Sequence, residues 1–323
     1  MVLTQSPAVA AALDAAVRAP SPHNTQPWIF ELAPDMIDVV LDEHRVLDAC
    51  DPEAREARLA CGAAVLNLEL ALAVAGRATE TEFAPERARP ALLARVTLGH
   101  RHRPTVTERR LAAAIPRRYS NRRPFADQAV PPGVRTAVRE AAREEGSHLV
   151  LLDEIGSLEA AAALIRRADH LQIHDGAFQD ELRAWTRRAT GEDGVPAFAG
   201  GPRSAGGLLP TRYVSEDGAE RAFERDPLVA VLTTPNDAPM SQVRAGRAMQ
   251  RVLLTATDAG LSASFCSQPI EIASARAELR ALLGGTDHPQ TVFRLGYGYP
   301  GVPTPRRPVH AVTRHVGTER KTS

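Results

Sequence analysis

Two long segments rich in alanine and leucine constrain the fold more than any other feature of this sequence. The first covers residues 52–75 and stops at Gly76, and the second covers residues 241–259 and stops at Gly260. A glycine directly after an apolar run is a typical C-terminal stop of a helix. The first run is apolar on nearly every face, and such a helix normally lies in the centre of a fold or in an interface. We therefore expect two central helices.

The second helix repeats the first. At an offset of 184 residues, the separation of Gly62 from Gly246, further identities are Ala64 with Ala248, Leu70 with Leu254, Ala75 with Ala259 and Gly76 with Gly260. Alanine-rich helices match one another easily, so these identities alone decide little. Farther along each half, Leu98-Gly99 and Leu295-Gly296 both end an expected strand. The shared order favours an internal duplication, with halves at residues 1–105 and 106–323.

The rest of the pattern alternates helices with short strands. Helices are expected at residues 7–18, 132–145, 158–168 and 178–188, and strands at residues 28–32, 37–41, 94–98, 228–233 and 291–295. The first two strands are separated by Ala33-Pro34-Asp35, which suggests a hairpin. Residues 100–123 are rich in arginine and read either as a linker or as part of a motif. Residues 191–213 form a long loop of small residues, and such a loop is usually functional or disordered.

Composition excludes several classes of protein. The formal net charge is zero, which gives no general attraction to nucleic acid or to an anionic membrane. No run of about 18 apolar residues is present, and Asp14 interrupts the apolar N-terminal stretch, so neither a membrane span nor a signal peptide is expected. Cys50, Cys61 and Cys266 are widely spaced and odd in number, which favours a reducing compartment over a disulfide framework. We expect a cytoplasmic protein.

Lysine is almost absent, since Lys321 is the single one. This excludes lysine Schiff-base chemistry and the lysine of phosphate-binding P-loops. The sequence also lacks the GxGxxG, HExxH and GxSxG patterns. His23 has no second ligand at a recognisable spacing, so no metal site is expected. Arginine would therefore have to bind any phosphate.

Four segments resemble the signature segments of FMN-dependent nitroreductases. They are Ala19-Pro-Ser-Pro-His-Asn-Thr-Gln-Pro-Trp28, Arg117-Arg-Tyr-Ser-Asn-Arg-Arg-Pro-Phe125, Gly260-Leu-Ser262, and Leu295-Gly-Tyr-Gly-Tyr-Pro300 followed by Pro305-Arg-Arg-Pro308. In that family they correspond to an SPSxxNxQPW loop, an RxSxR opening, a helix ending in GLG, and an LGYP…R ending. Each segment alone is modest evidence for the family, but four segments in consistent places are fairly specific evidence.

The order of these segments differs from that of an ordinary nitroreductase. There the RxS signature precedes the loop within each subunit of a homodimer, and the flavin lies at the dimer interface. Here the first half has the loop without the signature, and the second half has the signature but carries residues 144–149 in place of the loop. This is similar to the Acg subfamily of actinobacterial nitroreductase-like proteins. It implies an α+β fold, a three-layer α/β/α sandwich of the nitroreductase type, in which two tandem halves form an intramolecular pseudo-dimer with one flavin site.

The resemblance also implies which arginines bind FMN. Arg118, Ser120 and either Arg306 or Arg307 would bind the phosphate, since guanidinium groups form charge-assisted hydrogen bonds with phosphate oxygens. Arg122 would lie near the N1–C2=O edge of the isoalloxazine, where a cation favours the anionic reduced flavin. Without the resemblance, these arginines would read as a solvated basic loop.

The loop after the first helix would follow the flavin ring and the ribityl chain. The residues implied are Pro20, Ser21, Pro22, His23 and Asn24. Their alternative interpretation is a helix stop and a turn, with Asn24 bonded to the loop backbone. Gln26 is counted with this loop, although a buried scaffold amide is the simpler interpretation of it.

The implied activity is electron transfer from NAD(P)H through FMN to a nitroaromatic, a quinone or a similar small-molecule acceptor. No catalytic acid or base is expected, because the cofactor carries the redox chemistry. Residues 262–267 would contribute only backbone N–H groups near N5.

The alternative function is an FMN-sequestering or stress-related flavin-binding protein with little or no turnover. In it the 191–213 loop would close over the flavin as a lid, with Trp185, Phe198 or Tyr213 as caps. For Trp185, packing in the core is the simpler interpretation. Neither function calls for a nucleic-acid or membrane partner. Fusion of the halves makes a monomer sufficient without forbidding a homodimer.

Overall fold

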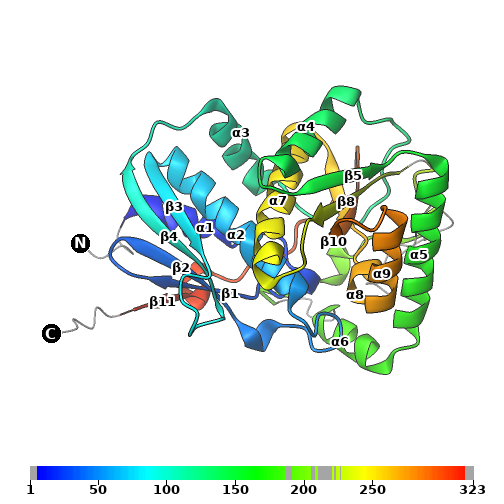
Figure 1. The fold of residues 1–323 in the computed structure, drawn as a ribbon, viewed down its shortest axis with the longest axis horizontal. Coiled ribbons are helices and arrows are strands. Elements are labelled where there is room, and N and C mark those ends of the chain that lie inside the picture. The colour runs from blue at the N-terminus through cyan, green and yellow to red at the C-terminus, as the bar shows by residue number, and fades with distance from the viewer. Residues whose placement is uncertain are drawn as a thin grey trace.

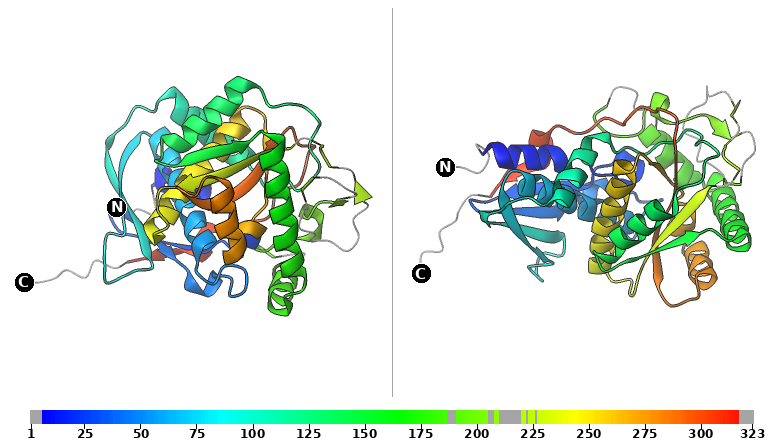
Figure 2. Two further views of the ribbon diagram at one scale, coloured as in Figure 1. Left: turned by 45° about the vertical axis from the view of Figure 1, so that its right-hand side comes forward. Right: turned by 90° about the horizontal axis from the view of Figure 1, so that it is seen from above.

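Two halves lie side by side in the protein, each with its own sheet, and two long helices lie between the sheets (Figure 1). The computed structural model describes residues 6–186, 191–204, 208–209, 220–221, 223–225 and 227–316. The central helices are α2 (Arg55–Val74) and α7 (Pro239–Asp258), which are the two helices that the sequence predicts. The further views in Figure 2 show the same side-by-side arrangement.

The two halves repeat one topology. The first contains α1 (Pro7–Ala16), β1 (Trp28–Leu32), β2 (Met36–Leu41), α2, β3 (Arg77–Phe83) and β4 (Leu92–Arg101). The second contains α4 (Pro132–Arg143), β5 (His148–Leu152), β8 (Leu228–Thr234), α7, β9 (Ser262–Phe265) and β10 (His288–Gly296). The strands lie in the order β1-β2-β4-β3 in one sheet and β5-β8-β10-β9 in the other, and all these pairs are antiparallel. The expected hairpin is confirmed, and the two halves share their order of elements. Strand β10 ends at Gly296 as predicted, but β4 continues to Arg101, so the prediction that Leu98-Gly99 ends a strand is wrong.

The second half carries insertions that the first lacks. Between β5 and β8 come α5 (Ile155–Ile173), α6 (Gly176–Thr186), a 3-10 turn (Ala197–Ala199) and the short parallel pair β6 (Arg203–Ser204) and β7 (Glu220–Arg221). Between β9 and β10 come α8 (Gln268–Glu271) and α9 (Ala273–Leu282). Four further 3-10 turns are described, at Pro22–Asn24, Glu43–Arg45, Ile115–Arg117 and Val309–Val312.

The central helices cross at two glycines. A Cβ atom on Gly62 would lie 1.9 Å from the carbonyl oxygen of Val243, and one on Gly246 would lie 2.0 Å from that of Leu59. Val243 lies 184 residues after Leu59, the same separation as between Gly62 and Gly246. Each glycine therefore contacts the residue that corresponds to its counterpart's partner in the other half. This is the reciprocity of an isologous contact between two related helices.

The second sheet is packed on both faces. Ala230 and Leu232 of β8 face the core that includes residues of α4 and α7, whereas Val229 and Val231 face a second core that includes residues of α5 and α9. This alternation gives the three-layer α/β/α arrangement. The first sheet packs the apolar face containing Trp28 against α1 and α2.

The segment between the halves contains a helix. The linker interpretation of residues 100–123 is wrong for α3 (Val106–Ala114), which begins at a capping box. The Thr105 Oγ1 atom accepts a hydrogen bond from the Glu108 backbone N–H at 3.1 Å, and the Glu108 carboxylate accepts one from the Thr105 N–H at 2.6 Å. These two bonds satisfy donors that would otherwise be unpaired at the helix start.

The C-terminal chain returns to the first half. Strand β11 (Thr313–His315) pairs in parallel with β1, so the first sheet takes its edge strand from the far end of the sequence. The division at residue 105 therefore describes order along the chain, and the first half depends on the C-terminal segment for part of its sheet.

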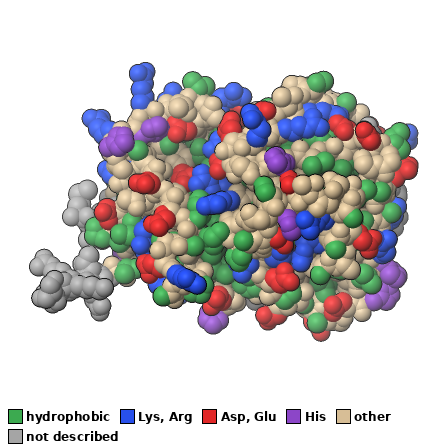
Figure 3. Space-filling view, in the orientation of Figure 1, with side chains coloured by type: hydrophobic (Ala, Val, Ile, Leu, Met, Phe, Trp, Pro, Cys, Tyr) green, Lys and Arg blue, Asp and Glu red, His purple; other side chains and the backbone are tan. Residues whose placement is uncertain are grey.

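Helix α2 is, among the described residues, the one helix with the length and hydropathy of a membrane span, and 78% of its most apolar window is buried inside the protein. On the face shown in Figure 3, acidic and basic side chains are interspersed.

Candidate functional site

A cavity opens where the two halves meet. It holds about 800 Å³ of empty space, part of which is open to solvent. Helices α2 and α7, the loop after α1, the segment after α3 and the region from β9 to α8 all contribute to its walls. The predicted site residues that line it are Pro20, Ser21, Pro22, His23, Ser120 and Arg122.

The loop between α1 and β1 has a strained backbone. His23, Asn24 and Gln26 have φ angles of 45°, 58° and 53°, in the left-handed region that is unfavourable for most residues other than glycine and asparagine. The Ser21 hydroxyl helps to hold this shape by accepting a hydrogen bond from the Gln26 N–H at 2.9 Å. Backbone strain of this kind gathers at functional sites, where the surrounding structure enforces it.

Asn24 and Gln26 are buried behind the cavity wall and tie the loop to distant segments. The Asn24 side-chain amide donates to the carbonyl oxygens of Gly194 and Pro305, both at 3.0 Å. The Gln26 amide donates to the carbonyl oxygen of Glu192 at 2.9 Å. Both side chains therefore act as cross-links in this structure, which agrees with the scaffold interpretation of Gln26.

Arg118 and Arg306 bring positive charges together without a carboxylate partner among the described residues. Arg118 is 6% exposed, and its Nη2 donates to the Arg18 carbonyl oxygen at 3.1 Å. The Arg306 Nη1 donates to the Asn24 Oδ1 at 3.0 Å. The Nε–H groups of both arginines are buried and have no acceptor in the described part of the chain. Each guanidinium thus has one buried donor without an acceptor in this part of the chain.

Their electrostatic environment supports the same conclusion. Burial lowers the pKa of Arg118 to about 10. Burial, followed by repulsion from Arg118, Arg18 and Arg122, lowers the pKa of Arg306 to about 9. Arginine nevertheless stays protonated in proteins, so these shifts express poorly compensated charge. A phosphate would satisfy the donors and offset the repulsion at once.

Ser120 and Arg122 line the cavity, whereas Arg118 and Arg306 are not among the described residues that line it. Ser120 forms an isolated β-bridge with Ala263, which fixes it on the wall beside β9. The Arg122 Nη1 donates to the Ala199 carbonyl oxygen at 3.3 Å. Gly201 lies directly on Arg122, because a Cβ atom there would be 2.4 Å from the Arg122 carbonyl oxygen.

Arg307 is oriented differently from Arg306. Its backbone N–H donates to the Gln26 Oε1 at 2.8 Å, and its Nη1 lies 3.9 Å from the Asp42 carboxylate. Of the two terminal arginines that the sequence leaves as alternatives, Arg306 is the one that joins Arg118.

The described part of the predicted lid, residues 191–204, is fastened to the site loop. Besides the contacts of Asn24 and Gln26, Asp193 pairs with Arg45 at 2.8 Å, and Val195 lines the cavity. Trp185 packs against the small cluster that contains Phe178, so the core interpretation fits it better than a cap. Phe198 is 57% exposed, and Tyr213 lies outside the described residues.

The sequence analysis missed one wall of the cavity. Phe265 and Ser267 lie in the segment expected to border the site, and Cys266 between them is buried in the second core, as a small hydrophobe would be. Further lining residues that carried no motif are Glu56, Leu59, Ala60, Val195, Met249, Gln268, Glu271 and Thr291.

The missed wall is acidic. The carboxylate oxygens of Glu56 and Glu271 and the Cys50 Sγ atom lie within 4.8 Å of one another. Asp51 lies behind them and caps α2, with its carboxylate accepting the backbone N–H groups of Glu56 at 3.1 Å and Ala57 at 2.8 Å. Burial first, and repulsion from Glu271 to a smaller extent, raise the pKa of Asp51 from 3.8 to about 6.

The raised pKa of Asp51 predicts a pH-dependent stability. Because the folded state binds this proton more tightly than the unfolded state, Asp51 should destabilise the protein as the pH rises from about 4 to about 6, by up to about 3 kcal/mol. Asp51→Asn should remove this part of the slope. Urea unfolding of both proteins at several pH values between 4 and 7 measures the difference, and parallel curves would contradict the assignment.

Comparisons with known proteins show which family the sequence matches. The model of the "Nitroreductase family" matches residues 115–299. A protein of Mycobacterium tuberculosis named "Putative NAD(P)H nitroreductase" is 32% identical over 313 residues, covering 93% of this chain and 89% of the relative. Another from the same organism, "Putative NAD(P)H nitroreductase acg", is 30% identical over 318 residues and covers 94% of both chains.

The chain belongs to the nitroreductase family. Its similarity to Acg extends over nearly the whole length of both proteins, so the expected resemblance to Acg-like nitroreductases is confirmed. The match to the family model begins at Ile115, just before the arginine signature, and leaves out the site loop of the first half.

Solved structures show lower overall similarity to this nitroreductase family member. A nitroreductase with bound FMN from Desulfitobacterium hafniense is 18% identical, with a TM-score of 0.42, and covers 64% of this chain and 98% of that one. A BluB-like flavoprotein from Clostridium difficile is 15% identical, with a TM-score of 0.40, and covers 64% of this chain and 99% of that one.

Proposed function

We propose that this cavity binds one FMN per chain, with the phosphate held by Arg118, Arg306 and Ser120. One observation carries the proposal: the buried Nε–H groups of both arginines have no acceptor among the described residues. The absence of a carboxylate partner in the same part of the chain makes the pair suited to a dianionic ligand. Because both guanidinium groups are already oriented by backbone and side-chain acceptors, phosphate binding needs little further ordering.

The remaining predicted residues divide into two groups. Pro20, Ser21, Pro22, His23 and Arg122 line the cavity and are proposed to contact the flavin ring or the ribityl chain. Asn24, Gln26 and Arg307 are proposed to act one step away. Asn24 orients the Arg306 guanidinium, while Gln26 fixes the loop against the chain at Arg307.

In this proposal the protein is an NAD(P)H-dependent oxidoreductase that reduces a nitroaromatic, a quinone or a similar acceptor. FMN supplies the hydride chemistry when bound. The chain binds and orients its ligands, and the partly enclosed cavity limits access of water. The names of the mycobacterial relatives support NAD(P)H as the reductant. No side chain is assigned as a general acid or base.

A second function is favoured by the lid segment. Residues 192–194 are bonded to the site loop and to Arg45, and Gly201 packs on Arg122. A lid that stays fastened in this way would hold FMN and slow the exchange of reductant and acceptor. The alternative is therefore a flavin-sequestering protein with little turnover.

The proposal includes an intramolecular pseudo-dimer. The repeated strand order and the reciprocal glycine contacts support a duplication, and the cavity takes residues from both halves. One chain can then supply a complete site, so a monomer suffices. We propose small molecules as its partners, and a cytoplasmic location as for a protein with three buried free cysteines.

The first experiment is a flavin titration of the purified chain. We expect a yellow protein that binds one FMN per chain, because the two halves contribute complementary parts of a single site. Absence of flavin bands after addition of FMN, or a stoichiometry of two, would overturn the proposal. Anaerobic mixing with NADPH or NADH then separates the functions, since bleaching supports the oxidoreductase and an unbleached spectrum supports sequestration.

A further inference from the structure

A buried ion pair lies next to the arginine signature, residues 117–125, and has no role in the FMN site as proposed so far. Arg294 of β10 is 1% exposed, and Glu224 is 6% exposed. The Arg294 Nη1 donates to the Glu224 Oε1. The Arg294 guanidinium also faces two aromatic rings, with its Cζ atom 4.1 Å from the ring centroid of Phe125 and 5.0 Å from that of Phe223. Both charges are therefore enclosed by protein.

The buried ion pair holds the backbone directly after Arg122. The Arg294 Nη2 donates to the Arg123 carbonyl oxygen at 2.8 Å, and the Glu224 Oε2 accepts a hydrogen bond from the Phe125 N–H at 2.9 Å. Hydrogen bonds to ionised groups are stronger than those between neutral groups. The ion pair thus fixes this end of the arginine signature through its backbone.

The two charges come from separate parts of the second half. Arg294 lies on β10, which pairs with both β8 and β9, whereas Glu224 belongs to the insertion between β5 and β8. The same insertion contacts the arginine signature again at Gly201, which packs on the Arg122 backbone. The insertion that carries the predicted lid is therefore attached to the segment that carries Ser120 and Arg122.

We propose that this buried ion pair is a positioning pair: it holds Ser120 and Arg122 on the cavity wall, and it makes FMN binding depend on the packing of the insertion at Glu224. This rests on the proposed function, in which Ser120 binds the phosphate and Arg122 contacts the flavin ring or the ribityl chain. The ion pair acts through the backbone and does not itself touch the ligand.

The physical reason is that the arginine signature is fixed on both sides of Arg122. On one side Ser120 forms its bridge with Ala263, and on the other side the buried ion pair bonds residues 123–125. A segment fixed in this way needs little ordering when a ligand binds. Without the ion pair, FMN must select the molecules in which the segment is ordered, and its affinity falls by the fraction that they represent.

The first test uses the unaltered chain. Amide hydrogen exchange is followed by mass spectrometry, with and without saturating FMN, in peptides that contain Phe125 or Glu224. We expect FMN to slow exchange in both peptides, because the ordered signature and the packed insertion stabilise each other. Slower exchange near Phe125 with unchanged exchange near Glu224 would overturn the inference.

The second test is the variant Arg294→Met/Glu224→Leu. A single change would leave one buried charge unpaired, whereas replacement of both charges by apolar side chains is often tolerated. We expect a folded chain that binds FMN about tenfold more weakly, as when the segment is ordered in about a tenth of the molecules. FMN should no longer slow exchange in the peptide around position 224. The midpoint potential of bound FMN should become more negative, because a less well placed Arg122 favours the anionic reduced flavin less.

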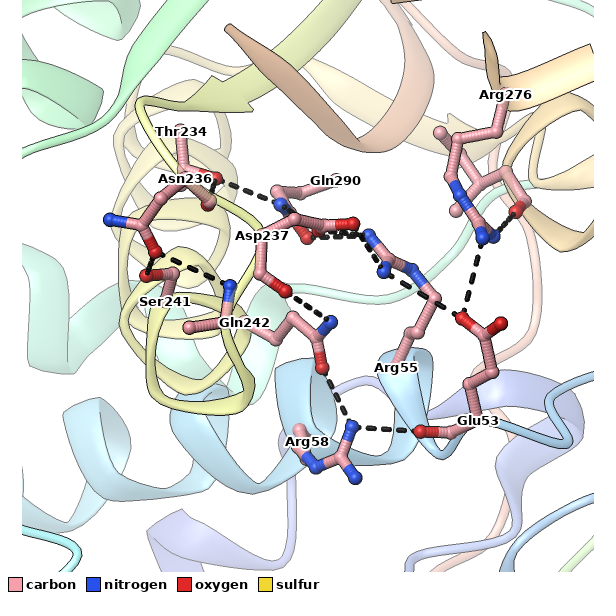
Figure 4. A network of polar contacts seen from close by, with 12 residues as sticks. Glu53, Arg55, Arg58, Thr234, Asn236, Asp237, Ser241, Gln242, Arg276 and Gln290 are labelled. Atoms are coloured by element: carbon pink, nitrogen blue, oxygen red, sulfur yellow. Dashed lines mark hydrogen bonds and ion pairs between the residues drawn. The ribbon is translucent and has the colours of Figure 1, made fainter. Parts of the chain in front are cut away.

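Arg55→Met/Asp237→Leu is the matched control. Arg55 is also 6% exposed and donates to the Asp237 carboxylate at 2.7 Å and to the Gln290 side chain of β10 at 3.3 Å (Figure 4). None of its hydrogen bonds within the described part of the chain reaches the arginine signature. The control should keep both the FMN affinity and the midpoint potential, and an equal loss of affinity in it would contradict the inference.

The outcomes also separate this inference from the proposed function. An unaltered chain that binds no FMN overturns both. A folded Arg294→Met/Glu224→Leu variant with unchanged FMN affinity and midpoint potential overturns the inference alone. If this variant does not fold, the exchange measurement on the unaltered chain decides.

Discussion

Arg118→Met is expected to weaken FMN binding by about 1.5–3 kcal/mol, a loss of roughly 10- to 150-fold in affinity, and at the same time to stabilise the FMN-free chain. The first effect follows from loss of a charge-assisted hydrogen-bond donor to the phosphate. The second follows from the cost of a guanidinium that is 6% exposed, keeps an unpaired Nε–H and lies among other arginines. Replacing such a buried charge with an apolar side chain of similar length should stabilise the fold by about 1–2 kcal/mol.

The opposite signs distinguish a ligand-binding arginine from a structural one. Urea unfolding without FMN measures stability, and a fluorescence titration measures FMN affinity. Arg117→Met is the control. Arg117 is next to Arg118 in the sequence, but its side chain is 54% exposed and lies beside Asp258. It should change both quantities little. If Arg118→Met instead destabilises the chain and leaves FMN affinity unchanged, Arg118 belongs to the scaffold and the phosphate lies elsewhere.

The elements that the sequence predicted well are those whose pattern reflects local burial. The two central helices were found from their long apolar runs that end at a glycine, and the hairpin of β1 and β2 from two short runs separated by Ala33-Pro34-Asp35. Strand β3 was missed because it is an edge strand with no buried residue, and its alternating Thr and Glu side chains give no hydrophobic signal. Strand β11 was missed because three residues become a strand only through pairing with β1.

The residues of the candidate site also fall into those that the sequence could predict and those that it could not. Residues within compact motifs, such as Pro20 to His23 and Ser120 with Arg122, could be placed on the cavity from sequence. Motifs could not show that Asn24 and Gln26 turn behind the wall, because this depends on three positive φ angles in one loop. Glu56 and Glu271 carry no motif at all. They meet because α2 and α8 converge, and only the tertiary structure brings their carboxylates together.

The two halves are alike in their packing and different around the cavity. The halves share strand order and the glycine crossing, which are requirements of packing. They differ where the site is built. The first half extends its α1–β1 connection into the strained loop, whereas the second joins α4 to β5 by a short turn with Gly146 at a φ of 71°. In the proposed function, one binding site is built on this repeated scaffold because each half supplies a different segment of it.

Gly62→Ala and Gly246→Ala are each expected to destabilise the protein by about 3 kcal/mol or more. The added methyl group would meet backbone carbonyl oxygen at 1.9 or 2.0 Å, so the helices must move apart. The clash is with backbone atoms, which have no rotamer to change. The expected loss of folding free energy is therefore at the upper end of the range for overpacked cores. Gly156→Ala is the control, because Gly156 lies in α5 with nothing within 4 Å of the added atom. It should leave stability unchanged or raise it by up to about 1 kcal/mol.

The reciprocity of the two contacts makes the double variant the decisive measurement. Both glycines hold the same pair of helices together, so separation caused by one alanine makes room for the other. The double variant should therefore cost clearly less than the sum of the single changes, with a coupling of about 1 kcal/mol or more. Urea unfolding of the four proteins gives this coupling directly. Strict additivity would mean that each alanine is accommodated locally, and the crossing would then not be one cooperative contact. Because α2 carries Glu56 and α7 carries Met249, separation of the helices should also widen the cavity and weaken FMN binding in all three variants.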